Sequence, residues 1–106
     1  MIIDSHCHLE YEPMSLDLTE TISRANKDGV KFLLTISTTD NSLKKILKIT
    51  SDFNCVYGTY GIHPHEAKNY KHIKSDEIIN KVNSSKKIIG IGETGLDFYY
   101  NHSEKK

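Results

Sequence analysis

Short apolar runs alternate with amphipathic stretches along the chain. Four runs rich in β-branched and apolar residues predict strands over 1–5, 30–37, 55–61 and 86–92. Three segments with apolar residues at helical spacing predict helices over 17–28, 40–50 and 75–83. This alternation is typical of an α/β fold in which helices pack against a parallel sheet.

The predicted helices carry start and stop signals. Asp17 and Glu20 form an N-terminal capping pattern before the first helix, and Gly29 offers a left-handed stop after it. Ser75 is expected to cap the third helix.

Length and composition indicate one domain. The chain has 106 residues, 37% of them hydrophobic, which is enough for one core. A complete eight-stranded α/β barrel needs about 200 residues or more and is excluded. The sequence shows neither a signal-peptide pattern nor a membrane-spanning apolar run. Two cysteines, Cys7 and Cys55, do not make a disulfide framework, so we expect a reduced, cytoplasmic protein.

The charge balance bears on nucleic-acid binding. Fourteen basic residues offset fourteen acidic ones, and only Arg24 among the basic residues is arginine. A protein that holds nucleic acid through its surface charge usually has a basic excess. If this chain handles phosphodiesters, we expect a bound metal ion to hold the phosphate instead.

Side chains capable of chemistry gather where the predicted strands end. They are Asp4, His6 and His8 at the end of the first strand, His63 and His65 after the third, and Glu93 and Asp97 after the fourth. In parallel α/β folds these strand ends meet at one rim, where functional sites form. We expect the histidines and carboxylates to converge there.

The spacing of His6 and His8 suits a metal site. Residues two apart on a strand share a face, so both imidazoles can reach one divalent ion. Glu93 would add an oxygen ligand and complete a mixed set suited to Zn, Mn or Mg. The pattern alone is also open to turn or surface histidines and a solvated loop glutamate, and the position directly after the first strand favours the ligand pair. Cys7 points to the opposite face and is expected to pack in the interior.

The remaining polar and aromatic candidates have more than one interpretation. Asp4 and Asp97 are supporting carboxylates that orient a ligand, or local caps. The histidines that flank Pro64 are metal ligands, substrate contacts or loop residues. His72 is expected at the surface, His102 stays undecided, and the Tyr99–Tyr100 pair is packing or a stacking lip for a base.

Three motifs closely resemble the TatD family of metal-dependent deoxyribonucleases, in the amidohydrolase superfamily. They are DSHCHL from Asp4, GIHPH from Gly61 and GETGLDFYY from Gly92. Their order and approximate spacing are those of the family, and the match spans 1–106. The resemblance implies the N-terminal part, about four β/α units, of a TIM-type (β/α)8 barrel. Residues 1–106 would then be a partial hydrolase domain.

The resemblance also implies roles for the candidates. Members of the family hydrolyse DNA, often single strands or 3′ ends, with one or two divalent ions (Mg, Mn or Zn). By motif, His6, His8 and Glu93 would ligate metal, with Glu93 also catalytic, and His63 and His65 would bind substrate. The family takes further ligands from later strands. We therefore expect a truncated nuclease with little activity alone.

Two alternatives remain. One is another hydrolase of the superfamily, acting on amides or lactones. The GETGLD segment favours the nuclease, because many relatives place a modified lysine on the fourth strand instead. The other alternative is a non-catalytic half-barrel. Both outer sheet edges would be open in any of these cases, which predicts self-association.

Overall fold

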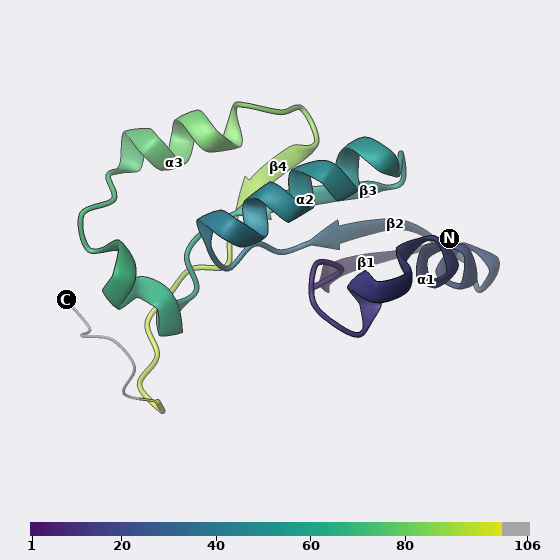
Figure 1. Cartoon of the computed structure of the whole chain (residues 1–106), viewed down its shortest axis with the longest axis horizontal. Helices are drawn as coiled ribbons and strands as arrows, with labels where there is room; N and C mark the ends of the chain where they lie inside the picture. Colours follow the sequence, from purple (N-terminus) through teal and green to yellow (C-terminus); the bar gives the residue numbers. More distant parts are fainter. Residues whose placement is uncertain (101–106) are drawn as a thin grey trace.

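The strands form one parallel sheet. The computed structural model describes residues 1–100, and its sheet order is β1-β2-β3-β4 (Figure 1). The strands are β1 (Ile2–Cys7), β2 (Val30–Thr35), β3 (Val56–Tyr60) and β4 (Ile88–Ile91). The predicted α/β class is confirmed. Within the described part of the chain, no further strand pairs with the outer edge of β1 or β4.

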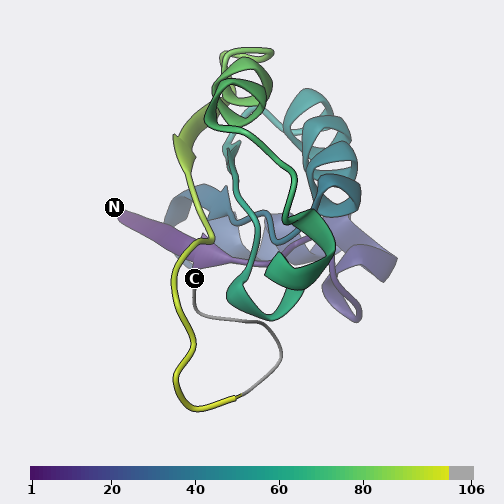
Figure 2. The same cartoon turned by 90° about the vertical axis from the view of Figure 1, so that its left-hand side faces the viewer.

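Helices connect successive strands. They are α1 (Leu18–Lys27), α2 (Asp40–Asp52) and α3 (Ser75–Val82), with two 3-10 helices, η1 (Met14–Asp17) and η2 (Pro64–Tyr70), that the sequence pattern did not predict. The α-helices gather over one side of the sheet (Figures 1 and 2). Along β4, Ile88 is 5% exposed, whereas Ile89 and Ile91 on the opposite face are each 59% exposed. The sheet therefore has one covered and one uncovered face.

The core lies between the sheet and the helices. It consists of two clusters: Leu9, Ile22, Leu33, Ile49 and Val56 in one, and Leu43, Ile46, Tyr60 and Ile88 in the other. Cys7 packs against the first cluster, as predicted. Burial, reinforced by the charges of Asp4 and Glu10, raises the pKa of the Cys7 thiol to about 12. The thiol is therefore a packing group at neutral pH.

Helix ends match the sequence signals in one case and differ in another. Asp17 caps α1 by accepting from the Glu20 amide at 3.4 Å, and Gly29 ends the connection at φ +98°. The predicted Ser75 cap is wrong. The extended residue before α3 is Lys74, which makes no side-chain cap, and Ser75 already lies inside the first turn. A hydroxyl inside the helix cannot take the position from which a cap reaches the first free amides.

A polar triad ties two helices to the sheet. Lys81 Nζ of α3 donates to Asp40 Oδ1 of α2 at 2.6 Å, and the fully buried Tyr60 of β3 also donates to Asp40. Partial burial alone would raise the pKa of Asp40. The hydrogen bonds from Lys81 and Tyr60 outweigh it and hold that pKa below its usual range. The ionised carboxylate thus stabilises the packing of α2 and α3 on β3.

None of the helices in residues 1–100 is long and apolar enough to cross a membrane.

Candidate functional site

A polar cleft of about 330 Å³ opens at the C-terminal ends of the strands. It contains the four predicted histidines and Glu93: His6, His8, His63, His65 and Glu93. Tyr11, Thr38 and Glu66 also line it, which the sequence pattern did not predict. The predicted convergence on one rim is therefore confirmed.

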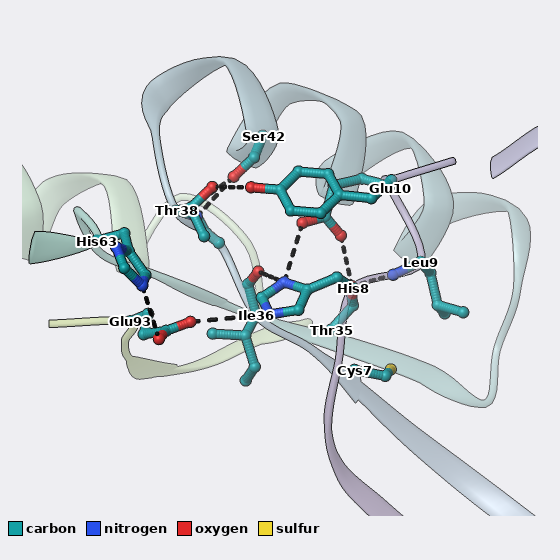
Figure 3. A network of polar contacts seen from close by, with 12 residues as sticks. Cys7, His8, Leu9, Glu10, Thr35, Ile36, Thr38, Ser42, His63 and Glu93 are labelled. Carbon is teal, nitrogen blue, oxygen red and sulfur yellow. Dashed lines mark hydrogen bonds and ion pairs between the residues drawn. The ribbon is translucent and has the colours of Figure 1, made fainter. Parts of the chain in front are cut away.

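Glu93 lies at the centre of this group. Its Oε2 is 3.7 Å from Nε2 of His6 and 3.7 Å from Nε2 of His8. Its Oε1 is 3.2 Å from Nε2 of His63 (Figure 3). One carboxylate thus contacts imidazoles from the ends of two different strands.

The backbone holds Glu93 in place. Its amide donates to the Ser37 carbonyl at 2.8 Å, and the Gly92 amide donates to the Tyr60 carbonyl at 2.9 Å. Gly61 permits this approach, because a Cβ there would lie 2.6–2.8 Å from backbone atoms of Gly92 and Glu93. The ends of β2 and β3 therefore determine where the carboxylate stands.

The donor atoms fit a divalent ion. One ligand atom from each of His6, His8 and Glu93 lies within 4.8 Å of the others. Two donors, each about 2.1 Å from one ion, can be at most about 4.2 Å apart, so both 3.7 Å contacts of Glu93 are compatible with shared coordination. The His6 side chain is 57% exposed and free to adjust. Imidazole with carboxylate suits Zn or Mn, and the ligand roles stay a prediction.

A backbone carbonyl determines which nitrogen of His8 carries a proton. Nδ1 of the ring lies 2.9 Å from the Ile36 carbonyl oxygen. A carbonyl only accepts, so Nδ1 is protonated, and in the neutral ring the lone pair is on Nε2, which lies 3.7 Å from Glu93 Oε2. Tyr11 stacks on the His8 ring, with centroids 5.2 Å apart and planes 13° apart, and its hydroxyl bonds to Thr38. These contacts hold the ring in one orientation, with Nε2 toward Glu93.

His63 has the opposite tautomer. The backbone amide of His65 donates to His63 Nδ1 at 3.0 Å. In the neutral ring the proton is therefore on Nε2, which lies 3.2 Å from Glu93 Oε1. In this state His63 is a hydrogen-bond donor, suited to a carboxylate or to an anionic group of a substrate, and its Nε2 is not a metal ligand.

The two supporting aspartates lie away from the central carboxylate. Asp97 accepts from His65 Nε2 and from the amides of Tyr99 and Tyr100, each at 2.9 Å. The hydrogen bond from the Tyr100 amide is the largest of the effects that hold the pKa of Asp97 below its usual range, and the hydrogen bonds from His65 and Tyr99 lower it further. Asp97 therefore orients His65 and its own loop. Asp4 accepts the His6 amide at 3.1 Å and so fixes the backbone at the end of β1.

The remaining candidates in the described part of the chain, a histidine and two tyrosines, lie at the surface. His72 is exposed, as expected. Tyr99 and Tyr100 are 86% and 52% exposed, so neither is buried packing, and the Tyr100 ring lies 5.3 Å from that of His65. His102 lies outside the described residues.

Glu10 was not among the predicted site residues. This residue is only 3% exposed, and its carboxyl lies next to His8. It lies in the turn that follows β1 (Ile2–Cys7), where the two-residue alternation of a strand no longer applies. Strand periodicity therefore gave no signal for its position.

Comparisons with known proteins show what the chain is similar to. The family described as "TatD related DNase" matches residues 3–106. An uncharacterized metal-dependent hydrolase of Buchnera aphidicola is 34% identical over 99% of this chain and 40% of its own length. The 3′-5′ ssDNA/RNA exonuclease TatD of Salmonella typhimurium is 29% identical over 96% of this chain and 39% of its own length.

A solved structure shows the same fold. The crystal structure of YjjV, a TatD homolog from Escherichia coli, matches 94% of this chain and 39% of its own with a TM-score of 0.76 and 27% identity. The chain thus spans about two fifths of the length of the relatives it matches. The match confirms the expected N-terminal part of a TIM-type barrel.

The three sequence motifs of this chain lie at the ends of β1, β3 and β4, and four of their histidines share one cleft with Glu93. The family match runs from residue 3 to residue 106. The chain therefore belongs to the TatD-related family of metal-dependent hydrolases.

Proposed function

We propose that this protein is a divalent-metal-dependent deoxyribonuclease, of which residues 1–106 form a partial hydrolase domain. The observation that carries the proposal is the contact of one carboxylate, Glu93, with His6, His8 and His63 inside one cleft. The exonuclease named among the relatives supports single-stranded DNA or 3′ ends as the substrate.

The metal would be held by His6, His8 and Glu93. A divalent ion there would activate water and polarise a phosphoryl oxygen. This also accounts for the zero net charge, because the ion rather than a basic surface would attract the phosphate. The proposed cofactor is one or two divalent ions, Mg, Mn or Zn. Titration of the protein with each ion measures which of them binds and how many.

The substrate would meet the two histidines of the next motif. His63 offers its Nε2–H toward Glu93, and the same proton can be donated to a phosphate oxygen. His65 is oriented by Asp97, so its ring is presented by a fixed partner. Asp4 would support the site indirectly through the backbone of His6. Glu93 would act both as a ligand and as the central catalytic carboxylate.

The direct experiment is a nuclease assay with controls for substrate class. Single-stranded DNA labelled at the 5′ end is incubated with the protein and Mn²⁺ or Mg²⁺, in parallel with a lactone and an amide substrate. Slow loss of 3′ nucleotides, as expected of a partial domain, that disappears in Glu93→Gln supports the proposal. Turnover of the lactone or amide with intact DNA would select the other hydrolase class.

We also propose self-association through the uncovered face of the sheet. An apolar groove of about 330 Å³ on that face is lined by Ile3, Phe32, Leu34, Tyr57 and Ile89 among others. Apolar surface of this kind usually marks an interface. Within residues 1–100, the outer edges of β1 and β4 pair with no further strand and so add unpaired backbone groups beside it. A cytoplasmic location stays a prediction, compatible with the two free thiols.

A further inference from the structure

A buried carboxyl group lies directly behind His8. Glu10 is 3% exposed, and its side chain is completely buried. Its Oε2 accepts the Thr35 hydroxyl at 2.8 Å. Its Oε1 has no hydrogen-bond partner in residues 1–100 and lies 3.5 Å from Nδ1 of His8 (Figure 3).

The orientation of this carboxyl group is set by a short chain of hydrogen bonds. The Leu9 amide donates to Thr35 Oγ1 at 3.1 Å, so the hydroxyl accepts from one side. The single hydroxyl proton of Thr35 then goes to Glu10 Oε2. With Oε2 engaged, the free Oε1 is turned toward His8.

A buried carboxyl oxygen without a hydrogen bond is costly, and such groups in native proteins call for an explanation. Glu10 is not among the residues that line the cleft, so it is neither a ligand nor a base for a bound substrate. Among the described residues, its free oxygen is paired only with the His8 ring, at a distance too long for a good hydrogen bond. The explanation must therefore lie in what Glu10 does for that ring.

We propose that Glu10 is a positioning residue for His8. Together with the Ile36 carbonyl, it holds the proton on Nδ1, so that Nε2 presents its lone pair to a divalent ion beside Glu93. Metal-bound imidazoles commonly donate their second N–H to a carboxylate or a backbone carbonyl, which fixes the tautomer and strengthens the ligand. His8 has both kinds of acceptor. The inference rests on the proposed metal site.

Ion binding and the Glu10 contact would reinforce each other. An ion on Nε2 withdraws electron density from the imidazole and makes Nδ1–H a stronger donor. Glu10 Oε1, which has no hydrogen bond in the described structure, would then gain a stronger interaction. Ion binding would thus offset part of the free-energy cost of leaving Glu10 Oε1 without a hydrogen bond.

The test is Glu10→Gln. Thr35 still donates to the side-chain oxygen, so the amide NH₂ is placed against Nδ1–H of His8, donor against donor. We expect the dissociation constant for Mn²⁺ or Zn²⁺ to rise roughly 10- to 100-fold. We also expect the ¹⁵N shifts of the His8 ring in the metal-free protein to move toward the Nε2–H tautomer. Glu12→Gln, which makes the same change at an exposed neighbour, is the matched control.

Unchanged affinity and unchanged His8 shifts in Glu10→Gln, relative to Glu12→Gln, would overturn the inference. If Glu10→Gln does not fold, the metal-free wild type still provides a test, because an Nε2–H tautomer of His8 contradicts the proposal. If the wild type binds no ion, the proposed metal site fails by itself. The ring shifts of wild type and variant then still test the dependence of His8 on Glu10.

Discussion

His8 and His63 face the same Glu93 carboxylate with opposite tautomers. The Ile36 carbonyl places the proton of His8 on Nδ1, whereas the His65 amide places the proton of His63 on Nε2. Two chemically identical side chains therefore have different capacities, one to bind a cation and the other to donate a hydrogen bond. A backbone acceptor beside His8 and a backbone donor beside His63 favour these two tautomers.

The metal site predicts a loss of binding on removal of both first-motif imidazoles. In calorimetric titration with Mn²⁺ or Zn²⁺, the wild type should bind weakly, and His6→Ala/His8→Ala should show no heat above dilution, because only Glu93 remains of the three ligands. His72→Ala removes an exposed histidine and is the control. Identical isotherms for the double variant and the wild type would rule out this site.

Residues 1–106 by themselves should have little nuclease activity. The relatives are about two and a half times as long, since the chain covers 40% of one of them, and the family resemblance places further ligands in later strands. We expect digestion of single-stranded DNA near background in Mg²⁺ or Mn²⁺. Robust turnover by a pure sample that Glu93→Ala abolishes would contradict this and would mean that protomers complete each other's sites.

Gly61→Ala should disturb Glu93 without touching it. The added Cβ would lie 2.6 Å from the Gly92 carbonyl carbon and 2.7 Å from the backbone carbonyl oxygen of Glu93. The backbone that carries the Glu93 carboxylate must therefore move. We expect a loss of about 1–3 kcal/mol in unfolding free energy, with weaker metal binding. Gly90→Ala, where the added atom has a neighbour only at 3.8 Å, is the matched control in chemical denaturation. Equal effects of the two substitutions would refute the close approach.

The Asp40 triad predicts a specific acid sensitivity. Because the folded-state pKa of Asp40 lies below its ordinary value of about 3.9, its ionisation stabilises the fold above that value. This contribution is lost as the pH falls through the lower folded-state pKa. The difference in melting temperature between wild type and Asp40→Asn should be constant near pH 6 and shrink below about pH 4. A difference that does not change down to pH 2 would argue against an ionised Asp40 in the fold.

The uncovered sheet face predicts association at micromolar concentration. Ile89 is 59% exposed and lines the apolar groove, so Ile89→Lys should reduce the apparent mass in size exclusion with light scattering. Lys86→Ile makes the reverse exchange at an exposed position just before β4 and should not have this effect. A compact wild-type monomer with a cooperative melt would show that this face does not associate.

Much of the fold was predictable from local pattern. The two-residue and helical periodicities located four strands and three α-helices, because they report which face of an element is apolar. The same alternation placed His6 and His8 on one side of β1 and Cys7 on the other. The 3-10 helix η2 was not predicted, because it has too few residues for a periodic signal. The predicted cap at Ser75 was wrong by one position.

The contacts among the candidate residues depend on the three-dimensional arrangement of the strands. The order of residues along the chain shows which side chains follow each strand, and therefore that imidazoles and carboxylates meet at one rim. It could not determine that Glu93 faces His63 as well as His8, or that Glu10 lies buried behind the ring. Those contacts depend on strand register and on carbonyl and amide groups contributed by distant segments. Backbone carbonyl and amide groups are nearly the same in every residue, so the local sequence does not predict which side chain they will contact.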